Sequence, residues 1–306
     1  MRHFLSINDL SRNEALYLLA EAARLKEELK ERPERGRKML YGKTLALVFE
    51  KPSLRTRVSF DAGMFQLGGH AIYLPPTEIG LGQRESVADV TRVLARMCDG
   101  IMARVFAHST VEEIAAHSRV PVINGLSDSE HPCQAMADLQ TLQECKGLAD
   151  INLTPRKIAY IGDGNNVCNS LMLLCAKLGV SISVATPQGY EVQPEYSRRA
   201  QQDGEVLLTN DPREAVQNAD AVYTDVWTSM GQEEESAQRL KDFQGFQINA
   251  DLMSQAKSDA ILLHCLPAHR GEEISEEALE SPQSKVFDQA ENRLHAQKAV
   301  LLWLMG

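Results

Sequence analysis

The sequence has no long apolar run and little positive charge. No stretch of the 306-residue chain approaches the roughly 18 consecutive apolar residues of a membrane-spanning helix. The chain carries 32 Lys and Arg against 42 Asp and Glu, and this net charge of -10 argues against a general nucleic-acid or anionic-membrane surface. Its first residues turn polar too soon for a secretory signal peptide. We therefore expect a cytoplasmic protein with no membrane or nucleic-acid partner.

Paired cysteines are also missing. The six cysteines include no C-x-x-C pair, so the sequence shows neither a zinc knuckle nor a thioredoxin-type motif. Several of them fall inside apolar helical patterns, as reduced core thiols do. In a chain of this length without a signal peptide, disulfides are not expected.

The sequence does have an ordinary globular composition, with 43% hydrophobic and 24% charged residues, and its length suggests two domains of about 150 residues each. Short apolar runs alternate with amphipathic helical stretches, the rhythm of parallel sheets covered by helices. We expect an α/β protein with two doubly wound domains of similar size, residues 1–149 and 150–290. The expected strands cover residues 44–49, 70–74, 101–105, 121–124, 157–162, 181–185, 205–208, 221–224, 260–264 and 285–287.

The first candidate site follows the apolar run at residues 44–49. There Pro52 turns the chain, and a helix begins near Ser53, followed by Arg55, Thr56 and Arg57. A helix N-terminus offers free backbone N–H groups and a positive dipole end, and arginines and hydroxyls add further donors. The combination suits a phosphate or a similar dianion, although an ordinary helix cap with solvated arginines has the same pattern.

The second candidate is His131-Pro132-Cys133-Gln134, at the start of an expected long helix that ends near residue 146. A spacing of three places His131 and Gln134 on one face of the first turn. Imidazole can donate to a carbonyl oxygen and a carboxamide can bond an amide nitrogen. A histidine that merely caps the helix is the competing interpretation.

The third candidate, His264-Cys265-Leu266-Pro267, directly follows an apolar run. In open α/β sheets ligands bind at the carboxyl ends of strands. The thiol of Cys265 could be a nucleophile, a metal ligand together with His264, or a contact that shapes the site. Two histidines and a cysteine within six residues suggest zinc, but no Asp, Glu or His partner at a familiar spacing supports it.

Two further motifs also follow expected strands. Gly162-Asp163-Gly164-Asn165-Asn166-Val167 imitates a dinucleotide-binding turn, but the third glycine is missing and no acidic residue follows the next strand. We therefore favour a polar substrate near the two asparagines over a nicotinamide cofactor. The second motif covers residues 225–232. Its Asp225 could pair with a substrate ammonium near Ser229, or simply cap a helix.

Together the five motifs resemble those of ornithine carbamoyltransferases in order and approximate spacing. They read Ser-x-Arg-Thr-Arg, His-Pro-x-Gln, Gly-Asp-x-Asn-Asn, Asp-x-x-x-Ser-Met-Gly and His-Cys-Leu-Pro. The first two are shared with aspartate carbamoyltransferases, and the last two are specific to the ornithine branch. The resemblance covers essentially the whole chain. It implies carbamoyl transfer to the δ-amine of L-ornithine, giving L-citrulline and phosphate, in arginine biosynthesis.

The resemblance also implies site residues. Carbamoyl phosphate would bind to Ser53, Leu54, Arg55, Thr56, Arg104, His131, Gln134, Leu266 and Arg293. Ornithine would bind to Asn166, Asp225, Ser229, Met230 and Cys265. The residues expected to act in catalysis are Arg55, Arg104, His131 and Cys265. No metal or organic cofactor is implied.

Family members have two α/β domains joined by two helices and assemble as homotrimers with active sites at the subunit interfaces. The resemblance therefore implies that a C-terminal helix at residues 291–306 completes the first domain, and that the two domains bind carbamoyl phosphate and ornithine respectively.

The chain departs from the family pattern in two places. Leu54 stands where the family usually has Thr, so a hydroxyl is lost from the phosphate cradle although the backbone N–H remains. In the loop at residues 78–85, Gly80 stands near a position where many relatives have Gln, and Gln83 or Arg84 could replace it in a neighbouring site. Three alternatives remain open: a carbamoyltransferase for putrescine or N-acylornithine, an NAD-dependent oxidoreductase, and a non-catalytic anion-binding module.

Overall fold

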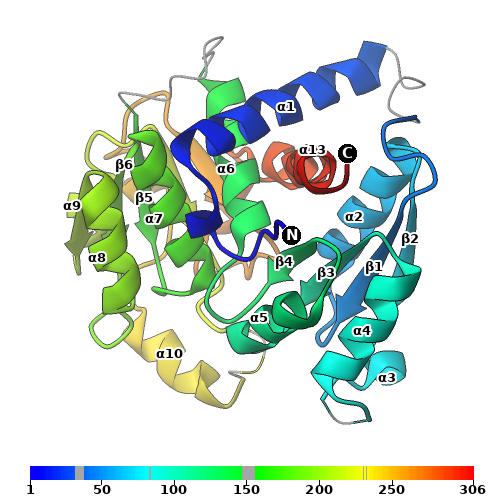
Figure 1. Ribbon diagram of the computed structural model, residues 1–306. Coiled ribbons are helices and arrows are strands. Elements are labelled where there is room, and N and C mark those ends of the chain that lie inside the picture. Colours follow the sequence, from blue (N-terminus) through cyan, green and yellow to red (C-terminus); the bar gives the residue numbers. More distant parts are fainter. Residues whose placement is uncertain (32–37, 83, 147–155, 230, 232) are drawn as a thin grey trace. The chain divides into compact units, whose positions relative to one another are not determined.

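The computed structural model describes residues 1–31, 38–82, 84–146, 156–229, 231 and 233–306 (Figure 1). By its contacts the chain divides into two units, Met1–Gln140 with Glu291–Gly306, and Thr141–Ala290. Each unit contains one parallel sheet flanked by helices, which confirms the predicted fold class. The expected boundary at 149/150 lies outside the described residues, and by contacts the second unit already begins at Thr141.

The sheet of the first unit has the strand order β2-β1-β3-β4, with all neighbours parallel. Its strands are β1 (Thr44–Phe49), β2 (His70–Leu74), β3 (Gly100–Arg104) and β4 (Val122–Leu126). The order reverses direction between β1 and β3. Such a switch point is where open α/β sheets bind their ligands, outside the carboxyl ends of the strands.

Alternate side chains of the first sheet face different helices because successive residues of a strand point to opposite sides. Ala46 and Val48 pack in a core with residues of α3 (Pro76–Ile79), α4 (Val87–Met97) and α5 (His108–His117). The other face is covered by α2 (Leu54–Gln66) and α13 (Val286–Met305). The packing of α13 is tight, because a side chain on Gly100 of β3 would lie 2.9 Å from the sulfur of Met305.

The N-terminal helix α1 (Arg12–Glu31) begins with a capping box formed by Ser11 and Glu14. The backbone N–H of Ser11 donates to the Glu14 carboxylate at 2.8 Å, and the N–H of Glu14 donates to the Ser11 hydroxyl at 3.3 Å. Further along, the Lys26 ammonium donates to Asn292 of α13 at 2.7 Å. A polar contact thus joins the first helix of this unit to the last.

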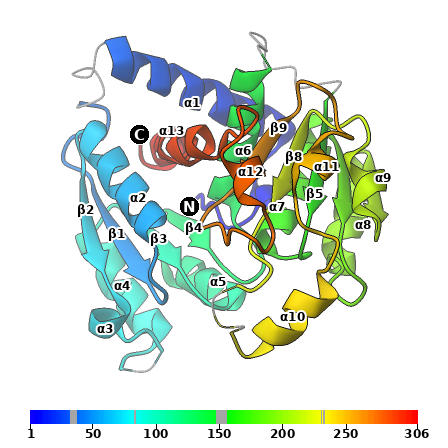
Figure 2. The ribbon, with the colours of Figure 1, turned by 180° about the vertical axis from the view of Figure 1, so that it is seen from behind.

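The sheet of the second unit has the order β7-β6-β5-β8-β9 and is also parallel throughout. Its strands are β5 (Lys157–Ile161), β6 (Ser181–Ala185), β7 (Val206–Thr209), β8 (Ala221–Thr224) and β9 (Ile261–His264). The helices are α7 (Asn166–Leu178), α8 (Pro194–Asp203), α9 (Pro212–Val216), α10 (Ser236–Asp242), α11 (Ala250–Met253) and α12 (Glu276–Leu279), seen from behind in Figure 2. The switch point lies between β5 and β8.

One expected strand, at residues 285–287, is wrong. Ser284 forms only an isolated bridge with Leu262, and α13 already begins at Val286, five residues before the expected start of the C-terminal helix. A short apolar run is compatible with either a strand or the first turn of a helix, and here the helix prevails. Across the described residues, no helix combines the length and apolarity needed to cross a membrane.

Candidate active site

The N-terminus of α2 is built as the sequence predicts. Ser53 adopts an extended backbone and its hydroxyl accepts the backbone N–H of Thr56 at 3.3 Å, so it caps the helix. The side chain of Leu54 is 74% exposed, which leaves its backbone N–H as its contribution to this helix end. Arg55 is half-buried, whereas Thr56 is fully buried.

Two arginines converge on the hydroxyl of Thr56. Arg104, at the end of β3, donates to Thr56 Oγ1 at 3.4 Å, and Arg293 of α13 donates to the same oxygen at 2.9 Å. The second guanidinium branch of Arg293 donates to Gln134 at 3.1 Å, and the Gln134 amide donates to Asp138 at 2.8 Å. Both arginines are at least nine-tenths buried, so this end of the sheet holds a concentrated positive charge.

His131 is a neutral imidazole beside that charge. The side chain is 3% exposed and directly precedes α6 (Pro132–Cys145). Burial first, and then the charges of Arg293, Arg104 and Lys51, hold the pKa of His131 well below its usual range. A neutral imidazole can donate one hydrogen bond to a carbonyl oxygen without adding a formal charge.

Lys51 is a further functional candidate, and none of the five sequence motifs includes it. Its side chain is 91% buried, and burial together with repulsion from Arg104 lowers the pKa of its ammonium to about 8. The ammonium lies 5.0 Å from the ring centroid of Phe106, a cation–π contact. The burial of this lysine is visible only in the packed structure.

In the second unit Asp225 contacts Cys265, another of the candidate ornithine-binding residues. It follows β8, is 6% exposed, and accepts the thiol of Cys265 at 2.9 Å and the amide of Asn165 at 2.9 Å. Cys265 follows β9, so the two residues come from neighbouring parallel strands. The geometry places a buried carboxylate and a thiol together at the carboxyl edge of the sheet.

The glycine-rich turn after β5 has a packing role. A side chain on Gly164 would lie 2.4 Å from the backbone nitrogen of Val192, so only glycine allows the segment around Val192 to approach. Asn165 caps α7 by accepting the N–H groups of Val167 and Cys168. The approach of this segment accounts for the glycine at position 164.

Arg239 also lies outside the five sequence motifs. From α10 its guanidinium donates to Asp163 at 2.8 Å and to the carbonyl of Trp227 at 2.9 Å. Burial raises the pKa of Asp163 to about 6, and the ion pair with Arg239 opposes that rise. This bridge fastens the turn after β5 to the loop after β8 that carries Asp225 and Ser229. No short motif could have revealed it, because it joins residues 76 positions apart.

Three other expected site residues follow the ends of β5, β8 and β9. Asn166 is the first residue of α7, Ser229 is half-buried in the loop after β8, and Leu266 follows Cys265 with a positive φ of 57°. Met230 and Gln83 lie outside the described residues. In the loop at 78–85, Gly80 ends α3 in a left-handed conformation and its carbonyl accepts the N–H of Arg84 at 2.8 Å.

The zinc alternative meets an obstacle in the hydrogen bonding of His264. Asp225, His264 and Cys265 do have ligand atoms within 4.8 Å of one another, a proximity that local spacing could not reveal. However, the Nδ1 of His264 accepts the Leu266 N–H at 2.9 Å, and its Nε2 lies 3.0 Å from Glu273. Neither nitrogen can bind a metal ion unless one of these bonds breaks.

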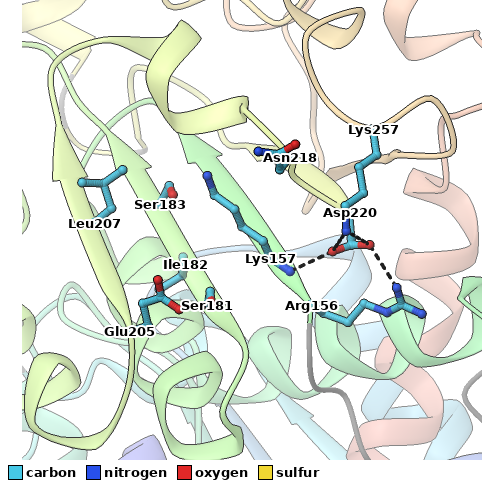
Figure 3. Close-up of a pocket in the computed structure, with 10 residues that line it drawn as sticks. All are labelled: Arg156, Lys157, Ser181, Ile182, Ser183, Glu205, Leu207, Asn218, Asp220 and Lys257. Carbon is cyan, nitrogen blue, oxygen red and sulfur yellow. Dashed lines mark hydrogen bonds and ion pairs between the residues drawn. The ribbon is translucent and has the colours of Figure 1, made fainter.

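A separate cavity of about 280 Å³ lies at the opposite edge of the second sheet (Figure 3). It is bordered by the first residues of β5 and β6, and Asp220 there pairs with Arg156 at 3.2 Å and with Lys257 at 2.9 Å. Because the candidate ornithine-binding residues follow the carboxyl ends of the strands, this cavity is not part of their site.

Comparison with known proteins identifies the family of the chain. Residues 2–144 match the aspartate/ornithine carbamoyltransferase carbamoyl-P binding domain, and residues 155–304 match the Asp/Orn binding domain of the same enzymes. The chain belongs to the aspartate/ornithine carbamoyltransferase family.

Within this family the chain is similar to proteins named ornithine carbamoyltransferase. The relative from Carboxydothermus hydrogenoformans is 53% identical over 312 residues, with 100% of this chain and 98% of the relative covered. The one from Thermococcus kodakarensis is 50% identical over 310 residues, covering 100% and 96%. The solved structure of ornithine carbamoyltransferase from Pyrococcus furiosus has a TM-score of 0.94 at 49% identity and covers 100% of this chain and 97% of its own. These likenesses confirm the resemblance stated from the motifs.

Proposed function

We propose that this protein transfers the carbamoyl group of carbamoyl phosphate to the δ-amine of L-ornithine, releasing L-citrulline and phosphate. The observation that carries the proposal is the convergence of Arg104 and Arg293 on Thr56 at the capped start of α2. Two buried guanidinium groups and a helix N-terminus form a site for a small dianion inside a protein of net charge -10.

Carbamoyl phosphate is assigned to residues of the first unit, together with Leu266 of the second. The phosphate is held by Ser53, the backbone N–H of Leu54, Arg55, Thr56, Arg104 and Arg293. His131 and Gln134 bind the carbamoyl group, because a neutral imidazole and a carboxamide match a carbonyl oxygen and an amide nitrogen. The backbone carbonyl of Leu266 accepts from the carbamoyl nitrogen.

Ornithine is assigned to residues of the second unit: Asn166, Asp225, Ser229, Met230 and Cys265. The buried carboxylate of Asp225 binds the α-ammonium, which directs the δ-nitrogen toward the carbonyl carbon. Cys265 positions that nitrogen, and its thiol already donates to Asp225. A covalent intermediate on sulfur is unnecessary, because the substrate supplies its own nucleophile.

The chemistry requires the neutral δ-amine, because an ammonium has no lone pair. An aliphatic amine of this kind has a pKa of about 10.4, so the reactive form is a minor species at neutral pH. Attack on the carbonyl carbon builds negative charge on its oxygen. Arg55, Arg104 and His131 stabilise that charge, and preorganised donors of this type each contribute about 3 kcal/mol. The arginines also stabilise the departing phosphate.

The biological setting is part of the proposal: a homotrimer in the cytoplasm that serves arginine biosynthesis. Support for self-association comes from large apolar side chains of the first unit that face outward. Leu54, Val58 and Phe65 of α2 and Ile72 of β2 are all at least 40% exposed. Exposed apolar side chains gathered on neighbouring elements are typical of contact surfaces between subunits.

A citrulline-release assay with purified protein tests the function. Carbamoyl phosphate is supplied with ornithine, putrescine or N-acetylornithine at equal concentrations. The proposal predicts that ornithine gives by far the largest kcat/KM. A preference for either other amine, or no citrulline from ornithine, would refute it.

A further inference from the structure

A compact group of two carboxylates and one imidazole lies just beyond the His264-Cys265-Leu266 segment. His269 and Glu272 stand at the two ends of a tight turn, in which the Glu272 N–H donates to the His269 carbonyl at 3.0 Å. Gly271 supports the turn with a φ of +90°. Glu273 follows and points inward, so its side chain is fully buried while the other two remain partly exposed.

The spacing of the three side chains suits one small cation. The Nδ1 of His269 lies 3.6 Å from Glu272 Oε2 and 4.0 Å from Glu273 Oε2, and all three ligand atoms lie within 4.8 Å of one another. Ligand atoms each about 2.1 Å from a shared ion are separated by roughly 3 to 4.2 Å. Both distances from the imidazole fall in that range without a change of backbone.

Glu273 has one oxygen with no hydrogen-bond partner. Its Oε1 accepts the His264 imidazole at 3.0 Å and the His269 N–H at 2.6 Å, whereas the buried Oε2 receives no donor. His264 faces Glu273 through its Nε2, while its Nδ1 accepts the Leu266 N–H at 2.9 Å. A buried carboxylate oxygen that receives no hydrogen bond is costly to the fold, so Oε2 is a position where a ligand would be stabilising.

The neighbouring side chains do not neutralise that charge. Arg270, between His269 and Gly271, forms ion pairs with Glu276 and with Glu280, the latter at 2.9 Å, on the exposed side. Glu273 has ion-pair partners only in His264 and His269 among the described residues. Even a protonated His269 would leave one net negative charge, since it faces both Glu272 and Glu273.

We propose that His269 Nδ1, Glu272 Oε2 and Glu273 Oε2 form a binding site for a divalent transition-metal ion. A cation of charge +2 balances the two carboxylates and satisfies the orphaned Oε2. One imidazole nitrogen with two carboxylate oxygens is a donor set for Zn²⁺ or Mn²⁺. The side chains of His269 and Glu272 are 46% and 38% exposed, so water completes the coordination. The ion also fixes Glu273, which holds His264 and, through it, the segment that carries Cys265.

Titration of the full-length protein with Mn²⁺, followed by electron paramagnetic resonance, tests the site without using the transfer reaction. We expect one Mn²⁺ bound per chain, with affinity at least tenfold weaker in His269→Ala and in Glu272→Gln. Glu277→Gln, which removes an exposed carboxylate of the neighbouring α12, controls for surface charge and should bind as the unaltered protein does. Cys265→Ser should also bind normally, because Cys265 supplies none of the three proposed ligand atoms.

Two results would overturn the proposal: no saturable Mn²⁺ binding, or binding that survives His269→Ala and Glu272→Gln. A second measurement uses Zn²⁺ and thermal unfolding of the Cys265→Ser protein. Zn²⁺ should raise its melting temperature, and the further substitution His269→Ala should abolish that increase. An increase that persists would place the ion elsewhere. Neither measurement depends on the identity of the substrates, so each can fail while the proposed function stands.

Discussion

Arg293 donates a hydrogen bond to Thr56 at 2.9 Å across 237 positions of sequence. The last helix of the chain thereby supplies a cation to the start of α2. The same guanidinium binds Gln134 at the beginning of α6, so one side chain links three separate segments of the first unit. The arrangement preorganises the charges that a dianion would meet.

Replacing Arg55 by Gly should nearly abolish turnover and leave the fold intact. Arg55 is half-buried at the helix start, and loss of one preorganised donor typically lowers kcat by about 100- to 1,000-fold. Steady-state citrulline formation measures the loss, and circular dichroism with thermal unfolding verifies folding. Arg57→Gln is the matched control, since Arg57 is exposed and stacks on Tyr73 at 3.9 Å. Full activity in a folded Arg55→Gly protein would remove this residue from the mechanism.

Replacing Asp225 by Ala should chiefly weaken ornithine binding. The buried carboxylate is the proposed partner of the α-ammonium, and its loss should raise the KM for ornithine at least tenfold. The dissociation constant of carbamoyl phosphate, measured by calorimetry without ornithine, should stay within about twofold of the original. An unchanged ornithine KM would contradict the assigned role.

Substitutions of Cys265 distinguish a positioning thiol from a nucleophile. Cys265→Ser retains a donor toward Asp225 and should preserve measurable turnover, whereas Cys265→Ala should lose more because the carboxylate loses a partner. A nucleophilic role predicts instead that both variants are equally inactive. Rapid-quench mass spectrometry of the unaltered enzyme with carbamoyl phosphate provides the independent measurement. A carbamoylated Cys265 would disprove the positioning role.

Lys51 should make the KM for carbamoyl phosphate depend on pH. Its ammonium, with a pKa of about 8, is charged below that pH and attracts the dianion; above it the charge is lost. The KM for carbamoyl phosphate should therefore rise as the pH increases through 8, and Lys51→Gln should flatten that rise. His131 has its pKa well below the usual range and stays neutral throughout, so it adds no inflection between pH 7 and 9. The kcat/KM for ornithine should still increase with pH in both proteins, because the neutral δ-amine becomes more abundant. A rise in KM near pH 8 that is identical in Lys51→Gln would assign it to another group.

Local sequence patterns determined most of the secondary structure. The capping box at Ser11, the cap at Ser53 and the proline that opens α6 each act within one helical turn, so they can be recognised without the rest of the chain. The strand expected at residues 285–287 was wrong because local pattern was insufficient there. A short apolar run carries too little periodicity to distinguish a strand from the start of a helix.

The candidate site was predictable only in part. Its residues follow expected strands, and their order matched a family, so Arg55, His131, Asp225 and Cys265 could be named from the sequence. Lys51 could not, because burial of a lysine in a turn depends on what packs over it.

The amino-acid sequence specifies which side chains stand at the ends of the strands, and its hydrophobic pattern specifies parallel α/β sheets. Which of those side chains come into contact depends on how the chain folds. Arg293 and Thr56, Arg239 and Asp163, and Cys265 and Asp225 are each joined across 40 or more positions. Such contacts arise from strand order and helix packing, which bring distant segments together and desolvate their charges. The spacing of residues along the sequence therefore cannot predict them.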